Sequence, residues 1–410
     1  MILVEEKNGL FLVIKIQKTA NSIFDYSNKE IKKIKEINTF IEESTFIINN
    51  NNRLLRIDKQ LNINPRKGDQ QLFHIRKDKN DEITIENPVL STLSLDNIDS
   101  LNYKLWFIIS SGSKINEINK DDYYLNKDDI LKFGNLKYII QEIHINIIEN
   151  KNEDKSSEEK NANNNLYDIS GLNNSFPKIS VTIPEIKTYY ESLDENSDIK
   201  CYICGKNNCS NDNPIIKFCD CNFVHFKCLK SCIKITTKIT KDGNVINYYI
   251  HMEFCKNCQY IYPLRFKLGE KIYELYEIEK PNEENYIILE SLEKKIYYGY
   301  IKLIHVIKFN QENDSVNIGR KNSSDVIVKD PSVSREHAIL KFDKEKQRIL
   351  IKDTSAKYGT LVLIKKAIKI NSNKIKIQIG KNIIEAQKMK FGEFEKIKDK
   401  KKTKYPLPKE

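Results

Sequence analysis

The stretch IGRKNSSDVIVKDPSVSREHAIL, residues 318–340, predicts the fold of the C-terminal part of the chain. A Gly-Arg pair ends one apolar run and a Ser-Arg-x-His cluster opens another, with Ser334 fourteen residues after Arg320. Between them, SSDVIVKD alternates like a strand and DPS indicates a turn. Two arginines and a serine hydroxyl are therefore expected on loops at one end of a β-rich unit. Arginine forks, a hydroxyl and loop N–H groups together can receive a phosphate.

Residues 300 to 388, which include DTSAKYGTLV at 353–362, resemble a forkhead-associated (FHA) domain, a β-sandwich that binds phosphothreonine peptides. The resemblance rests on Gly-Arg, Ser-x-x-His and Gly-Thr in the order and at the separations typical of the family. Short, evenly spaced apolar runs also predict a sandwich. The expected strands are 300–309, 316–318, 325–328, 338–342, 348–352, 360–364, 374–379 and 382–387.

The FHA resemblance implies a phosphothreonine-containing protein as partner. The phosphopeptide-binding residues that it implies are Arg320, Ser334, Arg335 and Lys357. His337 matches a residue that braces the loop from beneath, so we expect a structural role for it. Tyr358 stands where the family usually has an asparagine that holds the peptide backbone, and Lys357 is expected to add a phosphate contact. A degenerate sandwich that binds no phosphate is the alternative.

All nine cysteines lie between residues 201 and 258, and no signal peptide is recognisable. Clustered cysteines in a reducing compartment indicate metal ligands rather than disulfides. Pairs separated by one or two residues can hold a tetrahedral zinc ion from a tight turn, and four such pairs predict two zinc ions. The expected ligands are Cys201, Cys204, Cys219, Cys221, His225, Cys228, Cys255 and Cys258. Cys209 and Cys232 are left over, and either could replace one of these ligands.

The ligand order, with NPIIKFCDC and FVHFKCLKSCI, resembles the RING-CH type of RING finger. The resemblance implies interleaved sites, in which distant parts of the chain are tied together. One zinc would bind Cys201, Cys204, His225 and Cys228, and the other Cys219, Cys221, Cys255 and Cys258. RING-CH fingers usually act as E3 ubiquitin ligases, which dock a ubiquitin-conjugating enzyme and form no covalent bond to ubiquitin. Ile203 matches the usual apolar docking residue.

The finger departs from the RING-CH pattern in several places, which leaves its activity open. Cys232 stands where the family carries tryptophan, the last pair CKNC lacks the usual proline, and the following polar position is Gln259. A PHD finger that reads histone tails is one alternative, although Phe254 is not at the usual aromatic position. A purely structural zinc module within a signalling or chromatin scaffold is the other.

Length and charge limit the number of domains and the kinds of partner that we expect. The 410 residues correspond to about three domains of ~150 residues each. The net charge of +11 reflects a chain rich in lysine, which A/T-rich codons can explain, and the nine lysines at 388–410 predict a solvated tail. We expect no nucleic-acid partner. No apolar run approaches the roughly 18 residues that a membrane helix needs, so we expect a cytoplasmic or nuclear protein.

The N-terminal part is mostly strand-like. Residues 2–16 predict a hairpin, 28–43 a short amphipathic helix, and 72–147 several strands. Two segments are similar in sequence, DDILKFGNLKYII at 128–140 and SNKIKIQIGKNII at 372–384. This similarity indicates a second sandwich in the N-terminal part, although that part contains no Gly-Arg or Ser-x-x-His motif. A generic β-domain is the alternative to this degenerate FHA-like sandwich.

These patterns predict a mainly β, multidomain protein with a C-terminal FHA-like β-sandwich and a small central two-zinc RING-like α+β finger. The expected regions are an N-terminal β-rich domain (1–147), a disordered linker (148–198), a RING-CH-like zinc finger (199–266), a connector (267–298), the FHA domain (299–388) and a basic tail (389–410).

Overall fold

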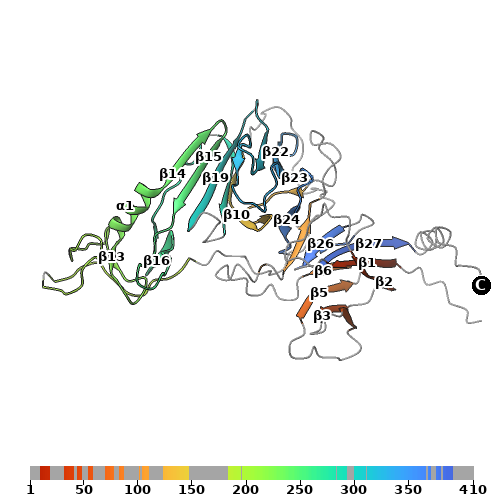
Figure 1. The fold of residues 1–410 in the computed structure, drawn as a ribbon, viewed down its shortest axis with the longest axis horizontal. Coiled ribbons are helices and arrows are strands. Elements are labelled where there is room, and N and C mark those ends of the chain that lie inside the picture. Colours follow the sequence, from red (N-terminus) through yellow and green to blue (C-terminus); the bar gives the residue numbers. More distant parts are fainter. Residues whose placement is uncertain are drawn as a thin grey trace, which may run out of the picture.

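The computed structural model is built mainly from β-strands, as expected, and the residues that it describes contain one α-helix (Figure 1). The structure describes residues 10–18, 32–40, 44–48, 54–58, 70–77, 83–86, 101, 104–109, 123–146, 183–194, 196–282, 284–292, 300–310, 312–365, 368–370, 375–379 and 382–390. Within these ranges no helix is both long and apolar enough to cross a membrane.

The C-terminal part of the chain forms strands where its apolar runs predict them, and each of the eight expected strands is confirmed. Burial alternates along them: in β20 the side chains of Val316 and Ile318 are buried, whereas that of Asn317 is exposed. This is the period of a half-buried strand. The strands are β18 (Asn285–Ser291), β19 (Ile301–Phe309), β20 (Ser315–Gly319), β21 (Val326–Ile327), β22 (Ala338–Asp343), β23 (Arg348–Asp353), β24 (Thr360–Leu363), β25 (Ile368–Lys369), β26 (Ile375–Ile379) and β27 (Asn382–Lys390).

Among the described residues, the N-terminal part contributes ten more strands. They are β1 (Leu10–Lys18), β2 (Lys32–Phe40), β3 (Ser44–Ile48), β4 (Leu54–Asp58), β5 (Gln70–Lys77), β6 (Ile83–Glu86), β7 (Leu105–Ile108), β8 (Tyr123–Tyr124), β9 (Ile130–Phe133) and β10 (Leu136–His144). The predicted helix over 28–43 is wrong, because 32–40 form β2, which pairs antiparallel with β1. β-branched residues favour strands, and pairing overrides a helix-like spacing. Residues 1–9 of the predicted hairpin lie outside the described ranges.

The central part of the chain forms a small α+β module. Its elements are β11 (Tyr189–Tyr190), β12 (Ile215–Ile216), β13 (Val224–His225), α1 (Phe226–Thr236), β14 (Lys238–Asp242), β15 (Val245–His251), β16 (Arg265–Leu268) and β17 (Lys271–Glu274). Strands β11, β12 and β13 form one small sheet, and β16 and β17 form a hairpin. Leu229 and Ile233, one helical turn apart, are the buried residues of α1.

The sandwich that contains residues 318–340 is built from both ends of the chain. One of its sheets has the order β21-β20-β22-β23-β8, and the other contains the run β19-β18-β10-β9-β24. Upstream and downstream strands are paired at Tyr124↔Leu350, Phe133↔Thr360 and Tyr138↔Ser291. The regions predicted as separate, 1–147 and 299–388, therefore share sheets and a core, in which Leu131 packs with Ile318 and Leu340.

The central module continues the same sheet. β15 pairs antiparallel with β19 over seven residues, from Val245↔Ile307 to His251↔Ile301, and β14 follows as the edge strand. Figure 1 shows these strands side by side, with α1 lying over β15. One apolar cluster contains Phe218 and Phe266 of the module together with Ile304 of β19. The module and the sandwich are thus joined by backbone hydrogen bonds and a shared core.

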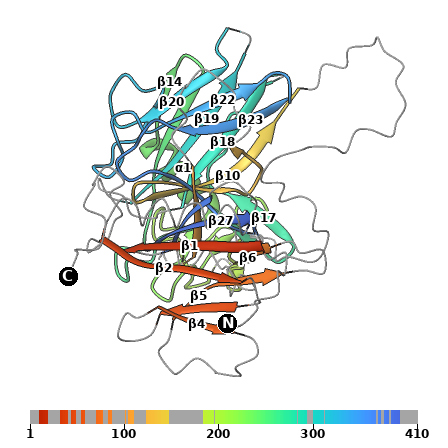
Figure 2. The same ribbon diagram turned by 90° about the vertical axis from the view of Figure 1, so that its right-hand side faces the viewer.

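The remaining strands lie at the other end of the molecule, below the sandwich in Figure 2. The large sheet runs on through β26, β27, β1 and β2, and a further sheet has the order β25-β6-β5-β3-β4. Strands of the two chain ends are again neighbours here, because β27 pairs with β1 along its whole length.

Candidate metal centres and phosphate-binding loops

Two groups of four ligand side chains converge in the central module. Cys201, Cys204, His225 and Cys228 form one group, and Cys219, Cys221, Cys255 and Cys258 form the other. Within each group the ligand atoms all lie within 4.8 Å of one another. The two sets interleave along the chain in the way that the RING-CH resemblance implied. Cys209 and Cys232 lie outside both groups.

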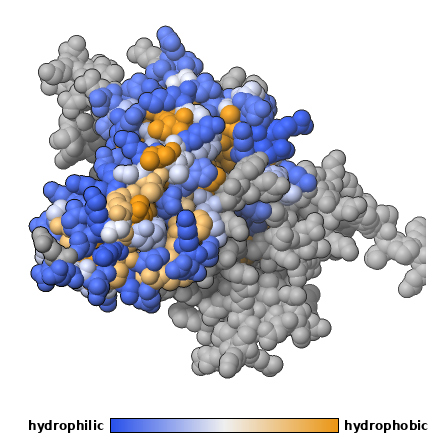
Figure 3. Space-filling view, turned by 60° about the vertical axis from the view of Figure 1, so that its left-hand side comes forward, coloured by the Kyte–Doolittle hydropathy of each residue, from blue (hydrophilic) through white to orange (hydrophobic). Residues whose placement is uncertain are grey.

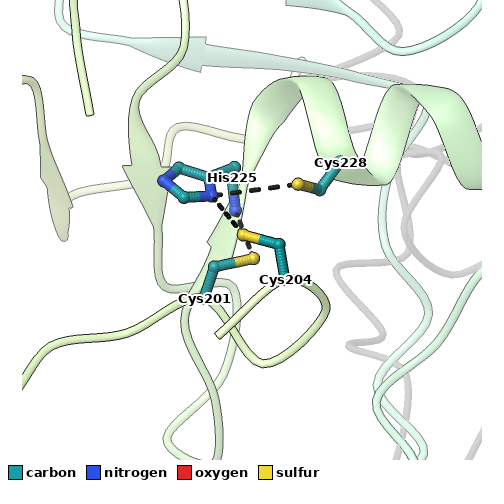
Figure 4. A group of neighbouring side chains, drawn as sticks. All are labelled: Cys201, Cys204, His225 and Cys228. Carbon is teal, nitrogen blue, oxygen red and sulfur yellow. Dashed lines mark hydrogen bonds between the residues drawn. The ribbon is translucent and has the colours of Figure 1, made fainter. Parts of the chain in front are cut away.

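The first group is assembled from a turn, a strand end and the first turn of α1 (Figure 4). Cys201 and Cys204 flank a tight turn closed by the Gly205 N–H, which donates to the Cys201 carbonyl at 2.8 Å. His225 ends β13, and the helix begins at the next residue, so Cys228 lies one turn beyond it. Residues three apart share a helix face, which lets both side chains reach the same point.

Hydrogen bonding fixes which nitrogen of His225 faces the sulfur atoms. Nε2 lies 2.7 Å from the carbonyl oxygen of Asn208, which can only accept, so Nε2 carries the proton. Nδ1 then presents its lone pair to the sulfurs, 3.3 Å from Cys204 Sγ and 3.8 Å from Cys228 Sγ. A carbonyl that orients a histidine in this way is typical of metal sites.

The second group repeats the turn of the first. The N–H of Cys255 donates to the carbonyl of Tyr260, and the N–H of Gln259 donates to that of Cys255, both at 2.8 Å. Gln259 has a φ of +63°, close to the +73° of Gly205 at the matching position. Its side-chain amide donates to the Lys256 carbonyl of its own turn at 3.1 Å.

The chemistry of the two groups fits zinc. Three thiols with one imidazole, and four thiols, are ligand sets of closed, structural zinc sites, whereas magnesium and calcium prefer oxygen ligands. Each group has buried members, which are Cys201 and His225 in the first group and Cys255 in the second. The other five ligands are half-buried or exposed cysteines. One metal would tie the 201–204 turn to His225 and Cys228, and a second would tie residues 219–221 to the 255–258 turn, which would stabilise the fold of this small module.

Apolar side chains are exposed beside both metal-binding turns. Tyr202 and Ile203 of the first turn are 41% and 37% exposed, and Tyr260 of the second is 40% exposed. The two turns are adjacent, because Tyr262 contacts Tyr202 through its hydroxyl and Tyr260 through its ring. Figure 3 shows the side of the molecule that carries the central module, where apolar patches lie among hydrophilic side chains. We refer to Tyr202, Ile203 and Tyr260 as the knuckle surface.

The predicted phosphate-binding residues come from three loops at one end of the sandwich. Arg320 directly follows β20, Ser334 and Arg335 lie between β21 and β22, and Lys357 lies between β23 and β24. Arg320 donates its backbone N–H to the Ser334 carbonyl at 2.9 Å and its Nε–H to the Val333 carbonyl at 3.1 Å. The structure therefore brings these residues together and holds the exposed guanidinium beside Ser334.

Gly319 permits this approach of two loops. A Cβ at residue 319 would lie 2.1 Å from the carbonyl oxygen of Arg335, a distance that no side chain can occupy. The absence of a side chain therefore keeps the Arg320 and Arg335 segments in contact.

Ser334 links all three loops. Its hydroxyl oxygen accepts the backbone N–H of Lys357 at 2.9 Å, which leaves the hydroxyl proton to donate to a ligand. Its own N–H donates to Nδ1 of His337 at 3.0 Å. His337 is fully buried, and its Nε2–H donates to the Gly359 carbonyl at 3.1 Å. The structural role expected for His337 is thus a brace between two loops.

Burial keeps the brace uncharged. It lowers the pKa of His337 to about 4, so the ring is neutral at physiological pH and Nδ1 remains an acceptor. Behind it, Asp353 accepts the Thr360 hydroxyl at 2.7 Å and the Ala356 N–H at 3.1 Å, and burial raises the pKa of its carboxyl group. Sequence reasoning missed Asp353, although an aspartate that opens DTSAKYGT suggests a side chain that caps its own loop.

Cationic groups surround the serine. Arg320, Arg335 and Lys357 are exposed, and Lys357 Nζ lies 5.2 Å from the centre of the Tyr358 ring. Lys321 forms an ion pair with Glu336 at the rim. A doubly ionised phosphate would therefore meet an arginine fork, a hydroxyl and further positive charge.

Comparison with known families identifies part of this sandwich. The FHA domain model matches residues 316–384, a range that contains all three loops. The chain therefore carries an FHA domain there, which implies binding of phosphothreonine peptides. No curated protein matches the chain.

Proposed function

We propose that this protein reads a phosphothreonine on a partner protein through Arg320, Ser334, Arg335 and Lys357, and that its zinc module recruits a ubiquitin-conjugating enzyme to that partner. The protein would act in the cytoplasm or nucleus as an adaptor with E3 ubiquitin ligase activity. The observation that carries the phosphate part is the hydrogen-bonded link from Arg320 to Ser334 and from Ser334 to Lys357.

Charge and geometry support the phosphate part. A phosphothreonine carries about −1.5 to −2 charges at neutral pH. The Ser334 hydroxyl already accepts one N–H, so its proton can be donated to a phosphate oxygen. The buried brace of His337 and Asp353 holds the backbone of the loops before any ligand arrives, which lowers the entropy cost of binding.

Calorimetry with paired peptides tests this part. A phosphothreonine peptide library and its unphosphorylated counterpart are titrated into the full chain, and binding is expected only for the phosphorylated form. A phosphoserine series measures the threonine preference. Equal affinity for both forms of the library would refute phosphate recognition.

The knuckle surface supports the ligase part. Ile203 occupies the position of the RING-CH docking residue and is exposed, as a docking side chain must be. Tyr202 and Tyr260 enlarge the apolar area around it, and aromatic residues are enriched at protein interfaces. The interleaved ligand groups also match the arrangement of this finger type.

A ubiquitylation assay with a panel of conjugating enzymes tests the ligase part. Autoubiquitylation or ubiquitylation of a bound phosphoprotein is expected, and Ile203→Ala should abolish it. Ile272→Ala is the matched control, because Ile272 is 51% exposed but lies on the β16–β17 hairpin. Silence with every conjugating enzyme, with zinc bound, would refute the ligase.

A signalling or chromatin scaffold without enzymatic activity is the second candidate, in which the zinc module is structural or PHD-like. The pairing of β15 with β19 favours a structural role, because a zinc module whose strands extend the sandwich sheet stabilises that sheet without binding a partner. Phe254, near the aromatic position of PHD fingers, packs against Tyr300 with ring centroids 5.6 Å apart. Binding of histone-tail peptides to the knuckle surface would separate the PHD-like form from the structural one.

A further inference from the structure

The large sheet repeats itself about its centre. Ten of its strands have the order β19-β18-β10-β9-β24-β7-β26-β27-β1-β2. Each strand from β1 to β10 can be matched with the strand whose number is 17 higher, so that β1 corresponds to β18 and β7 corresponds to β24. With these correspondences, the order of the strands is the same whether the sheet is read from one edge or from the other. The two five-stranded sheets, β21-β20-β22-β23-β8 and β4-β3-β5-β6-β25, match under the same rule.

The strand registers obey the same symmetry. β24 and β7 are neighbours at the centre, where Val362 pairs with Phe107, Leu361 with Ile108 and Leu363 with Trp106. On its other side, each of these two strands pairs with a further strand, and the registers of these two outer pairings are equivalent. The outer pairs are Thr360↔Phe133 in β24–β9 and Leu105↔Ile379 in β7–β26.

The amino-acid sequence carries the same relationship. The similar segments at 128–140 and 372–384 contain the paired strands β9–β10 and β26–β27, and Gly134 and Gly380 occupy equivalent positions in the two sequences. In the first hairpin Leu136 pairs with Phe133, and in the second Asn382 pairs with Ile379. These residues are equally distant from the two glycines.

We infer that the chain contains two copies of one ten-strand unit that have exchanged their last three strands. Strands β8–β10 of the upstream copy complete the sandwich of β18–β24, and β25–β27 of the downstream copy complete that of β1–β7. The hairpin β9–β10 thereby positions the phosphate-binding loop between β21 and β22. This last step rests on the proposed phosphopeptide function, whereas the exchange itself does not.

The turn of the exchanged hairpin presses directly on the phosphate-binding loop. Gly134 has a φ of +59°, and a Cβ there would lie 2.4 Å from the carbonyl oxygen of Ser332. The backbone N–H of Asn135 donates to the Ser332 hydroxyl at 2.8 Å, and that hydroxyl in turn donates to Asp330. Ser332 is two residues before Ser334, so the hairpin fixes the loop that carries the phosphate ligand.

Buried polar contacts hold the exchanged strands in place. The Tyr124 hydroxyl of β8 donates to Asp343 of β22 at 2.6 Å. Lys365, just after β24, pairs with Asp129 at 2.9 Å, and the Asp129 side chain is only 4% exposed. Such partners are costly to separate in the interior, so these contacts favour the exchanged arrangement specifically.

Two engineered cysteine pairs in the full chain, loaded with zinc, test the exchange. Lys132 and Leu361 are direct partners in β9 and β24, at a spacing of about 4.5–5.5 Å between Cα atoms, which a disulfide can bridge. Gln378 and Leu361 are separated by β7 and therefore lie at least two strand spacings, or ~9.6 Å, apart, which is too far for a disulfide. If no exchange occurred, the symmetry would place Gln378 opposite Leu361 and move Lys132 away.

The variants Lys132→Cys/Leu361→Cys and Gln378→Cys/Leu361→Cys share one substitution and are oxidised in parallel, with the bonds mapped by mass spectrometry. We expect the first pair to close within one chain and the second to stay open. The reverse result, or a first pair that stays open, overturns the exchange. If the first pair closes only between two protein molecules, the strands are exchanged between molecules, and the arrangement within one chain is overturned.

Phosphopeptide affinity tests the positioning role. Gly134→Ala should weaken binding by about tenfold or more, a factor that corresponds to about 1.4 kcal/mol, since the new methyl group displaces the Ser332 segment. Gly243→Ala is the matched control, because Gly243 also has a positive φ, +49°, but open space around it. If the Gly134→Ala protein does not fold, the phosphopeptide affinity of Ser332→Ala, a substitution that adds no atoms, is measured in its place.

Unchanged affinity in Gly134→Ala and Ser332→Ala, with the wild-type chain binding phosphopeptide, overturns the positioning role. A wild-type chain that binds no phosphopeptide refutes the proposed function instead, and the disulfide result still decides the exchange.

Discussion

The ring of Phe133 meets the imidazole of His337 edge-on, with the ring centroids 5.4 Å apart. Phe133 ends β9 in the upstream part of the chain, whereas His337 braces Ser334 in the downstream part. Edge-to-face contacts of aromatic rings add to the stabilisation that burial provides. The loop that carries Ser334, a residue of the proposed phosphate site, is therefore supported by a residue about two hundred positions away in the sequence.

Arg320→Ala is expected to abolish measurable phosphopeptide binding. Each hydrogen bond from a charged group to the phosphate contributes about 1.5–3 kcal/mol, and the arginine fork can make two. Isothermal titration with a phosphothreonine peptide measures the loss. Arg265→Ala is the control, because Arg265 is an exposed arginine on the zinc module, paired with Glu274. Normal binding by Arg320→Ala would contradict the proposed site.

His337→Leu is expected to destabilise the protein. The substitution leaves the Ser334 N–H and the Gly359 carbonyl without their partner, and each buried unpaired group costs about 1–3 kcal/mol. Denaturant unfolding measures the change in the free energy of unfolding. His251→Leu is the comparison, because His251 is exposed at the end of β15 and should change it by less than about 0.5 kcal/mol. Equal effects of the two substitutions would argue against the brace.

Acid is expected to destabilise the sandwich through its buried histidines. Burial lowers the pKa of His305 to about 3 and that of His337 to about 4. In the unfolded chain a histidine titrates near about 6.5. The unfolded state therefore binds more protons below that pH, and stability falls as the pH drops from about 6.5 towards 4, by at most about 1.4 kcal/mol per pH unit for each histidine.

His305→Gln should flatten this pH dependence. His305 Nδ1 lies 2.6 Å from Asn247 Oδ1 in the core, and glutamine keeps a polar group there without a titration near neutrality. Low pH also releases metal from cysteine and histidine ligands, so the difference between the two proteins at each pH is the informative quantity. Parallel curves of unfolding free energy against pH would count against this explanation.

Removal of single cysteines should separate the metal ligands from the remaining cysteines. Cys228→Ser is expected to lower the zinc content from two ions to one, because it breaks the first ligand group. Cys232→Ser should retain both ions, since Cys232 lies outside the groups but on the same helix. Elemental analysis of the purified proteins gives the count. A Cys232→Ser protein with one zinc ion would mean that Cys232 is a ligand.

Tyr358→Asn is expected to strengthen phosphopeptide binding. The FHA resemblance places an asparagine here that holds the peptide backbone, and one added neutral hydrogen bond contributes about 0.5–1.5 kcal/mol. The measurement is the ratio of dissociation constants for one phosphopeptide. Tyr358→Ala controls for the loss of the ring beneath Lys357. Equal affinities of Tyr358→Asn and Tyr358→Ala would show that the amide makes no contact.

Local patterns predicted much of the site and of the downstream strands. Gly-Arg, Ser-x-x-His and the paired cysteines each lie within a few residues of one another, so spacing alone limits where their side chains can point. The alternating burial of β20 likewise follows from its own sequence. By contrast, the isoleucine spacing at 28–43 predicted a helix that pairing with β1 replaced by a strand, because tertiary contacts override weak local preference.

Sequence patterns predicted an FHA-like sandwich in the C-terminal part and metal-binding cysteine and histidine pairs in the central part, and the RING-CH resemblance implied how these pairs are grouped. The sequence also revealed the similarity between 128–140 and 372–384. The sandwich that each of these hairpins joins became clear from the three-dimensional strand pairing, because two similar hairpins can pair with either sheet through the same backbone hydrogen bonds. The choice then depends on distant side-chain contacts such as Tyr124–Asp343 and Lys365–Asp129, which no local pattern encodes.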